Sequence, residues 1–284
     1  MPSVLITGTS KGIGFESALA FARAGYNVHA TMRNPAASPK LAEIASRENL
    51  PISVSTLDVD DDHSVSSAVT SIQKLHGPID ILVNNAGVER VGSIEEMPLA
   101  EFRATMETNY FGALRCIQAV IPHMRERRSG CIINVTSVAG RISNPPLTAY
   151  CASKWALEAA TEGLAIELKP FNVRVALVEP GIIDTSMARR VETNSNHSHY
   201  PHTARFAALF AASLSNPVPP SLVAHKILQV ASNGATQLRH PVGPDAQPLL
   251  DWRRSMSDEQ WIAHHSADDA TFAAGMARDL NLKM

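Results

Sequence analysis

The stretch Ser3–Gly14, SVLITGTSKGIG, decides the fold of this chain. An apolar, strand-like run ends at Thr7, and Gly8, Gly12 and Gly14 then lead directly into a helix-like pattern. A strand that passes through a glycine turn into a helix is the first unit of a parallel α/β sheet. Glycines in such a turn let backbone N–H groups approach a phosphate at the positive end of the helix. The spacing is G-x-x-x-G-x-G and not the commoner G-x-G-x-x-G, so a tight turn without a ligand stays an alternative.

Strand-like and helix-like segments alternate from this turn onward. Further strands are expected at 27–32, 52–59, 79–87, 131–137 and 172–181. Helices are expected at 14–26, 38–49, 61–77, 98–127 and 150–168. The strands are almost wholly apolar, which is typical of a sheet covered by helices on both faces. The sequence therefore predicts one α/β domain over residues 1–284, with a Rossmann-type doubly wound parallel sheet of about seven strands.

Two segments late in the chain depart from this alternation. Residues 183–220 mix helix-like pieces with Asn, His and Pro clusters, and we expect a substrate loop there. After a helical pattern and an edge strand, we expect residues 245–284 to form a helical C-terminal extension. His197, His199 and His202 lie in the loop without carboxylate or sulfur partners at metal-ligand spacing. We therefore expect solvated histidines and no metal site.

Composition restricts the classes of partner and the compartment. The net charge is −2 and no long basic run appears, which argues against nucleic acid as a partner. We expect no membrane span and no secretory signal, because no apolar segment has the required length or flanks. The odd number of cysteines, Cys116, Cys131 and Cys151, favours a cytoplasmic protein with reduced thiols. Cys151 is interpreted as a packing residue, with a reactive thiol as the alternative.

The residues around the second strand indicate which dinucleotide would bind. An NAD site is expected to show Asp or Glu at the end of this strand, where the carboxylate bonds the ribose hydroxyls. Met32 and Arg33 stand there instead, and Lys11 lies inside the glycine loop. Either cation alone is commonly a solvated surface charge. Together, and without a carboxylate, they favour the extra phosphate of NADP(H).

Ser137, Tyr150 and Lys154 form the candidate catalytic group. Ser137 ends a strand at the edge of the sheet where ligands bind, and Tyr150 and Lys154 are one helical turn apart. A free phenol has a pKa of about 10, which a neighbouring ammonium and an oxidised nicotinamide would lower. In the reductive direction the phenol would give its proton to a carbonyl oxygen held by Ser137. A tyrosine and a lysine at this spacing also occur together by chance.

The combination of motifs resembles the short-chain dehydrogenase/reductase family. The motifs TGTSKGIG, LDV, NNAG, ETNYFGALR, NVTSVAG, YCASK and EPGIIDT occur in the family's order over residues 3–190. The glycine spacing is similar to that of the compact members. The segments ATMRNP and YCASKWALEAATEGLAIELKPFNV resemble the hydroxysteroid and retinol dehydrogenase branch.

This resemblance implies a role for each matching residue. Tyr150 would be the general acid/base, Lys154 would bind the nicotinamide ribose and lower the pKa of the phenol, and Ser137 would orient the substrate oxygen. Asn109 would hold a water that relays protons from the lysine, and Asn84 would brace the sheet. The residues that the resemblance places at the cofactor are Gly8, Thr9, Ser10, Lys11, Gly12, Ile13, Gly14, Arg33, Asp58, Val59, Asn85, Ala86, Gly87, Tyr150, Lys154, Pro180, Gly181, Ile183 and Thr185.

The predicted function is an NADP(H)-dependent oxidoreductase that interconverts a ketone or aldehyde and its alcohol. The apolar segment ARFAALFAASL favours a hydrophobic carbonyl substrate, steroid-, retinoid- or aryl-ketone-like, with simple packing as the alternative. The resemblance also implies a homodimer or homotetramer. Two further hypotheses stay open: NAD-linked alcohol oxidation in a degradative pathway, and an NADP-sensing protein without catalysis.

Overall fold

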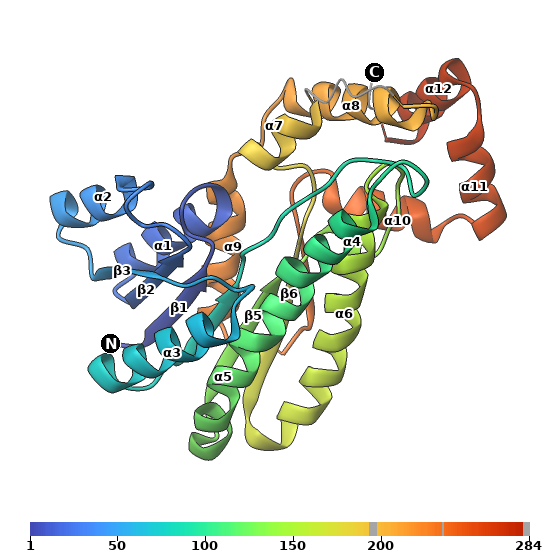
Figure 1. The fold of residues 1–284 in the computed structure, drawn as a ribbon. Coiled ribbons are helices and arrows are strands. Elements are labelled where there is room, and N and C mark those ends of the chain that lie inside the picture. Colours follow the sequence, from blue (N-terminus) through green and yellow to red (C-terminus); the bar gives the residue numbers. More distant parts are fainter. Residues whose placement is uncertain (193–197, 235, 281–284) are drawn as a thin grey trace.

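The computed structural model describes residues 1–192, 198–234 and 236–280 of the chain, and its centre is a single parallel sheet (Figure 1). The seven strands are ordered β3-β2-β1-β4-β5-β6-β7. They are β1 (Ser3–Thr7), β2 (Asn27–Met32), β3 (Ile52–Thr56), β4 (Ile81–Asn84), β5 (Gly130–Val135), β6 (Val173–Pro180) and β7 (Arg239–Val242). The chain runs outward from β1 to β3 and then returns to the other side of β1 with β4. This order confirms the predicted doubly wound sheet, and it opens a crevice at the carboxyl ends of β1 and β4.

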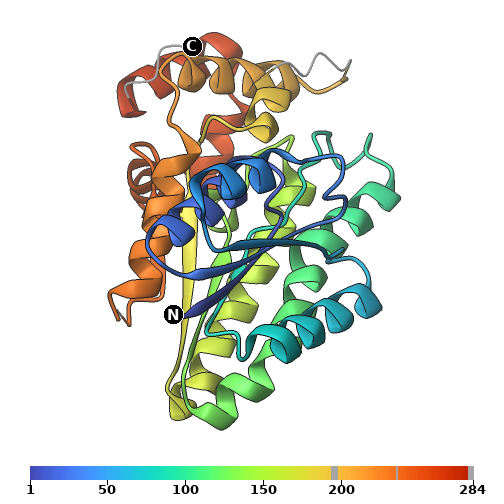
Figure 2. The same ribbon diagram turned by 90° about the vertical axis from the view of Figure 1, so that its left-hand side faces the viewer.

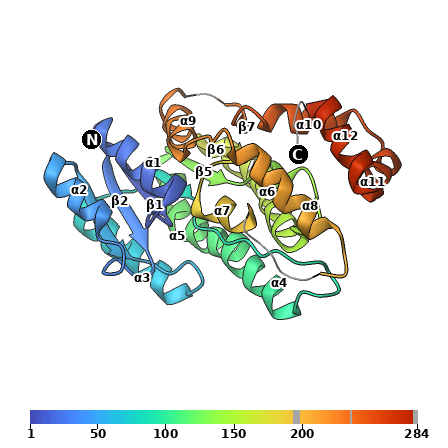
Figure 3. The same ribbon diagram turned by 90° about the horizontal axis from the view of Figure 1, so that it is seen from above.

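Helices cover both faces of the sheet. The α-helices are α1 (Gly12–Arg23), α2 (Lys40–Glu48), α3 (Asp62–His76), α4 (Leu99–Met106), α5 (Gly112–Arg127), α6 (Thr148–Leu168), α7 (Ser186–Glu192), α8 (His202–Leu214), α9 (Pro220–Ser232), α10 (Ala246–Arg254), α11 (Asp258–Ser266) and α12 (Asp269–Leu280). Shorter turns of other helix types are η1 (Glu107–Phe111), η2 (Val138–Gly140) and η3 (Lys169–Phe171). Seen from above, α4, α5 and α6 lie on one side of the sheet and α1 and α9 on the other (Figure 3).

The apolar strands supply a core on each face. Along β1, Val4 and Ile6 pack with residues of α1 and α9, whereas Leu5 between them packs with residues of α3 and α5. Successive side chains of a strand point to opposite faces, so a strand buried on both faces must be apolar at every position. This requirement explains the unbroken apolar runs that the sequence shows.

The predicted strands end earlier in the structure than in the sequence pattern. The strand expected at 52–59 ends at Thr56, and the one expected at 79–87 comprises only Ile81–Asn84. The residues that follow leave the sheet and line a cavity at its carboxyl edge. Several of these residues are apolar or small because they form the cavity wall. In the sequence alone, such a residue looks the same as one that belongs to a strand.

The two late segments gather beyond the carboxyl ends of the strands. Helices α7 and α8 form one group there, and the C-terminal helices α10, α11 and α12 adjoin it (Figures 1 and 2). Phe206 and Val191 from the first group are buried against Leu147 and Cys151, which belong to the start of α6. The insert is therefore mostly helical and packs over the crevice.

Candidate active site

The glycine turn after β1 is shaped to take an anion. Gly8 has a φ of +71°, and a Cβ built on it would lie 2.8 Å from the Cα of Ala86, so only glycine fits there. Helix α1 begins directly after the turn, and its N-cap residue, Lys11, makes no side-chain capping hydrogen bond. The backbone N–H groups of the first helical turn are thus open to a phosphate, which the positive end of the helix would also attract. The turn fits the pyrophosphate of a dinucleotide.

The segment after β4 holds this turn in place. The Thr7 hydroxyl oxygen accepts hydrogen bonds from the backbone N–H groups of Asn85 and Ala86, both at 3.1 Å. The Asn85 side chain donates to the carbonyls of Thr7 and Gly8 at 3.0 and 3.1 Å. The Asn85 amide therefore braces the turn, and the residue offers its backbone to the cavity. Asn84 donates to the Asn134 side chain at 2.9 Å, which confirms its predicted role as a brace of the sheet.

A cavity of about 360 Å³ runs from this turn to the start of α6. The predicted cofactor residues that line it are Gly8, Ser10, Lys11, Gly12, Ile13, Arg33, Asp58, Val59, Asn85, Ala86, Gly87, Tyr150, Lys154, Pro180, Gly181, Ile183 and Thr185. Two predicted residues lie behind the wall: Thr9, which is buried and donates to the carbonyl of Thr31, and Gly14, whose position is packed against Gly8 and Asn85. Both shape the turn from behind.

Ser137 and Tyr150 face each other across the inner end of the cavity. Both residues line the cavity, and the serine hydroxyl is close enough to the phenol to lower its pKa. The Ser137 hydroxyl also accepts from the backbone N–H of Ala139 at 3.1 Å and lies 3.3 Å from the carbonyl oxygen of Pro180. These contacts fix the serine hydroxyl beside the phenol, so a substrate oxygen between them would meet two hydrogen-bond donors.

Lys154 lies deeper than Tyr150 on the same face of α6. Its ammonium donates to the carbonyl of Val135 at 2.9 Å and stands 5.6 Å from the centre of the Tyr150 ring. Only 4% of the residue is exposed. Burial lowers the pKa of this ammonium to about 8, and the Glu158 carboxylate opposes the change. The lysine is thus charged at neutral pH but close to its titration range.

Burial decides the acidity of Tyr150 in the protein itself. It raises the pKa of the phenol well above its usual range, the neighbouring Ser137 hydroxyl lowers it, and the charges of Cys151 and Glu89 raise it further. The expectation that Lys154 would make the phenol more acidic is therefore outweighed here, because the cost of burying a phenolate is larger. A neutral phenol at neutral pH is a proton donor.

Asn109 lies beside this group and outside the cavity lining. Its side-chain oxygen accepts from the backbone N–H of Val88 at 2.8 Å, and its side-chain nitrogen donates to the carbonyl of Val88 and to the Ser153 hydroxyl at 2.8 and 2.9 Å. The residue belongs to the π-helical turn η1, which interrupts the helix predicted over 98–127. Both amide hydrogens are used in these contacts, so the side chain ties the loop after β4 to α6, and the relay water stays a prediction.

The turn after β6 is held by a residue that the sequence did not single out. Asp245, just before α10, accepts the backbone N–H of Ile182 at 2.7 Å. A Cβ built on Gly181 would lie 2.1 Å from its other carboxylate oxygen, so the close approach requires glycine. Thr185 packs against the glycine turn: its Cγ2 would lie 3.5 Å from a Cβ placed on Gly12. The C-terminal extension therefore helps to position the predicted nicotinamide end of the cavity.

The opposite end of the cavity carries the two cations from which the sequence predicts NADP(H). Lys11 and Arg33 are both exposed and both line the cavity, and Arg33 directly follows Met32, the buried last residue of β2. The nearest carboxylates come from the loop after β3. Of these, Asp60 accepts the Thr108 hydroxyl at 2.9 Å, and burial raises the pKa of its carboxyl group.

The insert closes the inner end of the cavity with apolar residues and one ion pair. Phe206, Leu209 and Phe210 of α8 pack around Tyr150. Arg190 of α7 makes two hydrogen bonds, of 3.2 and 3.1 Å, with the carboxylate of Glu89. Glu89 follows the NNAG motif and is 7% exposed. No local pattern indicates this pair, because the two residues are 101 positions apart in the chain.

The histidines of the insert do not form a metal centre with other described residues. The backbone N–H of His199 donates to Glu96 at 2.7 Å, and His202 begins α8. His197 lies outside the described residues. Within the described ranges, no group of three or more His, Cys, Asp or Glu side chains is arranged to hold a metal ion. Over the same ranges, no helix combines the length and apolarity needed to cross a bilayer.

A cavity that joins a phosphate-binding glycine turn to a serine, a tyrosine and a lysine defines a class of nicotinamide-dependent oxidoreductases. Residues 2–196 match the family model described as short chain dehydrogenase. The chain is similar to retinol dehydrogenase 8 of Bos taurus, with 37% identity over 252 residues, covering 87% of this chain and 80% of that protein. It is also similar to the crystal structure of a short-chain dehydrogenase from Streptomyces avermitilis, with 31% identity, a TM-score of 0.77, and coverage of 89% and 92% of the two chains. An actinorhodin polyketide ketoreductase solved with NADPH has 26% identity and a TM-score of 0.76, and covers 84% of this chain and 95% of its own.

The chain belongs to the short-chain dehydrogenase/reductase family, in its retinol and hydroxysteroid dehydrogenase-like branch. This confirms the resemblance that the motifs indicated. The protein is accordingly an NAD(P)-dependent oxidoreductase that acts on CH–OH donors or the corresponding carbonyl compounds.

Proposed function

We propose that the protein is an NADP(H)-dependent reductase of hydrophobic ketones or aldehydes, with Tyr150 as its proton donor. The observation that carries this proposal is the half-buried pair of Ser137 and Tyr150, which lines the inner end of the cavity beside the apolar side chains of α8. A bound nicotinamide would supply the hydride. The protein supplies the proton, from a phenol whose raised pKa keeps it protonated at neutral pH.

The two ends of the cavity support the choice of cofactor and of substrate. Lys11 and Arg33 offer cations where the adenosine end would lie, and the end of β2 offers no carboxylate to a ribose hydroxyl. At the inner end, Val191, Phe206 and Leu209 present an apolar surface to a substrate. A carbonyl compound with an extended apolar body fits this wall better than a sugar, which would leave its hydroxyls without partners.

A panel of carbonyl compounds tests this proposal. We expect NADPH oxidation, followed by its absorbance, with steroid-like, retinoid-like and aryl ketones or aldehydes, and little with polyhydroxylated sugars of similar size. Product stereochemistry is measured in the same assay. If only sugars react, the substrate class is wrong, and if only alcohols with NAD⁺ react, the degradative oxidation takes its place. NADPH binding without turnover of any compound would instead favour a cofactor sensor.

We further propose that the protein works in the cytoplasm as a homodimer or homotetramer. Its three cysteines are unpaired and buried, as suits a reducing compartment. Large apolar side chains stand exposed on the long helices, with Trp155 at 50% and Ile166 at 73% on α6, and Phe111 at 45% just before α5. Burial of these side chains between copies would stabilise an oligomer. Sedimentation equilibrium should give a multiple of the 30.6 kDa chain mass, and a monomer at micromolar concentration would contradict this assembly.

A further inference from the structure

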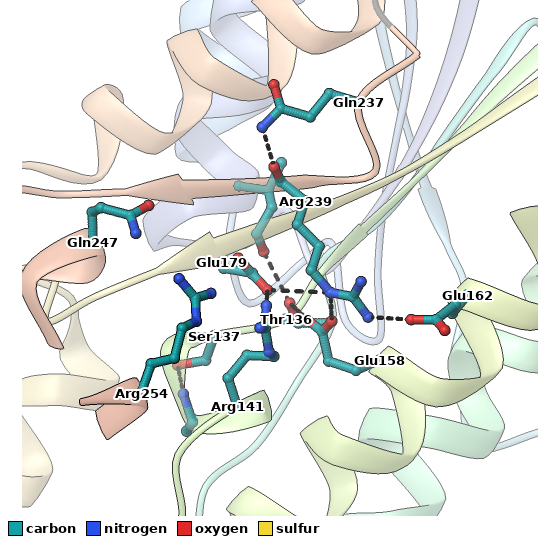
Figure 4. Close-up of polar contacts among 12 residues, drawn as sticks. Thr136, Ser137, Arg141, Glu158, Glu162, Glu179, Gln237, Arg239, Gln247 and Arg254 are labelled. Carbon is teal, nitrogen blue, oxygen red and sulfur yellow. Dashed lines mark hydrogen bonds and ion pairs between the residues drawn. The ribbon is translucent and has the colours of Figure 1, made fainter. Parts of the chain in front are cut away.

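A group of charged residues built around two buried carboxylates lies close to Ser137 (Figure 4). Glu158 of α6 and Glu179 of β6 are 4% and 0% exposed. Arg239, from the edge strand β7, lies 3.0 Å from the Glu158 carboxylate through its Nε and 3.8 Å from that of Glu179. Arg141 adds a contact of 3.2 Å to Glu179. Buried charges are costly even when paired, so such a group invites a reason beyond stability.

The end of β5 is tied to α6 by two consecutive contacts. Lys154 donates to the carbonyl of Val135 at 2.9 Å, and the hydroxyl of the next residue, Thr136, donates to Glu158 at 2.6 Å. Lys154 and Glu158 are one helical turn apart, so both contacts arise from the same face of α6. The residue after Thr136 is Ser137. The two contacts together set where this serine stands relative to the lysine.

The second carboxylate connects the same group to the turn after β6. Glu179 immediately precedes Pro180, whose carbonyl oxygen lies 3.3 Å from the Ser137 hydroxyl. Arg239 is within ion-pair distance of both Glu158 and Glu179, and it therefore joins α6, β6 and β7 at one point. None of the charged residues in this group lines the cavity, so they act on the site only through their neighbours.

We propose that Glu158 is a positioning residue of the active site, whose carboxylate, compensated by Arg239, holds the end of β5 in register and keeps the Lys154 ammonium charged. This inference rests on the proposed function. Among the described residues, Glu158 is the charged group that opposes the effect of burial on the pKa of Lys154, which supports the second part. Without it, the lysine would lose its proton at lower pH.

Other charges also face the lysine and the tyrosine, and each has a fixed partner or a fixed place. The titratable and charged groups around the pair are Cys151 on α6, Glu89 after β4, Arg141 after η2, Glu179 on β6 and Arg239 on β7. Glu89 is paired with Arg190, and Glu179 with Arg141. Glu158 also raises the pKa of the Glu179 carboxyl, so removing its charge lets Glu179 ionise more readily beside Arg141 and Arg239.

Glu158→Gln is the decisive variant, because glutamine can still accept the Thr136 hydrogen bond but carries no charge. In the reductive direction we expect the alkaline limb of the kcat profile to move to lower pH by roughly one unit, since without the Glu158 carboxylate the Lys154 ammonium loses its proton more easily. The matched control is Glu162→Gln. Glu162 contacts the same Arg239 at 2.7 Å but lies at the surface, with 57% of its side chain exposed, and its profile should stay as in the wild type.

A second variant should move the alkaline limb of the kcat profile in the opposite direction. It therefore distinguishes the proposed electrostatic effect from a folding defect in Glu158→Gln. Arg239→Gln removes the cation beside Glu158, so the negative field at Lys154 grows and the alkaline limb should move to higher pH. A structural defect would lower kcat in both variants without moving the limb in opposite directions. Equal shifts in the Glu162→Gln control, or no shift in either variant, would overturn the role of Glu158.

The ionisation of Lys154 provides a readout that needs no turnover. An NMR pH titration of the protein with ¹⁵N-labelled lysine follows it, and the signal lost in Lys154→Arg belongs to Lys154. We expect this ammonium to lose its proton at lower pH in Glu158→Gln than in the wild type, because the Glu158 carboxylate raises its pKa. If no compound of the panel reacts, the proposed function fails, and the titration then decides the role of Glu158 by itself. If the panel reacts but the titration and the pH profile stay unchanged, the inference about Glu158 fails.

Discussion

Replacing Tyr150 by phenylalanine should lower kcat for carbonyl reduction by about 10²–10⁴-fold, the usual contribution of a positioned general acid. The change removes one hydroxyl and leaves the ring packed against Leu209 and Phe210. No other proton donor replaces it, because Lys154 is bonded to the carbonyl of Val135 and Ser137 to the backbone around it. The Kd for NADPH, measured by fluorescence titration, should change little.

Tyr26→Phe is the matched control for this variant. Tyr26 packs edge-on against Phe21 at 5.1 Å between ring centres, and it does not line the cavity. Its loss of a phenolic hydroxyl should leave kcat unaltered. A Tyr150→Phe enzyme that retains wild-type kcat on its best substrate would exclude the phenol as the proton donor, and the proposed mechanism with it.

Replacing Arg33 by aspartate should reverse the cofactor preference. In the wild type the guanidinium would bond the extra phosphate of NADPH, and a charge-assisted hydrogen bond of this kind is worth about 1.5–3 kcal/mol. The carboxylate of the variant would repel that phosphate and could bond the ribose hydroxyls of NADH instead. Each 1.4 kcal/mol is tenfold, so the ratio of kcat/KM for NADPH to that for NADH should fall by at least about a hundredfold.

Two further variants test whether the change in cofactor preference is specific to position 33. Arg47→Asp makes the same change of charge on α2, at a side chain that is 70% exposed and outside the cavity lining, and it should keep the NADPH preference. Arg33→Ala should weaken NADPH without improving NADH. A wild-type enzyme that prefers NADH, or an Arg33→Asp enzyme that still prefers NADPH, would place the selectivity elsewhere in the site.

The family and the doubly wound class of the sheet were predictable because both show in local patterns. A strand buried on both faces must be apolar along its length, and β1 shows this directly before a glycine turn. The glycines mark a backbone that only they can adopt, as the φ of Gly8 shows. Tyr150 and Lys154 share a face because one helical turn separates them, whatever the rest of the fold does.

The limits of the strands and the acidity of the phenol depended on surroundings that no local pattern contains. The strand expected over 131–137 comprises Gly130–Val135, and Ser137 stands in an extended backbone just beyond it. Lys154 was expected to lower the pKa of Tyr150, but burial raises it, because the insert and the start of α6 enclose the phenol. Burial follows from packing of distant segments, and only the three-dimensional structure measures it.

By itself, the sequence determined the class of fold, the glycine turn, and the serine, tyrosine and lysine of the candidate site, since each of these rests on residues close together in the chain. Only the tertiary structure decided which residues support them. Glu158 meets Arg239 across 81 positions, and Asp245 meets Ile182 across 63. Such pairs form only when strand order and register bring the end of the chain beside its middle. A shift of one residue in the pairing of a strand would turn its side chains to the opposite face of the sheet.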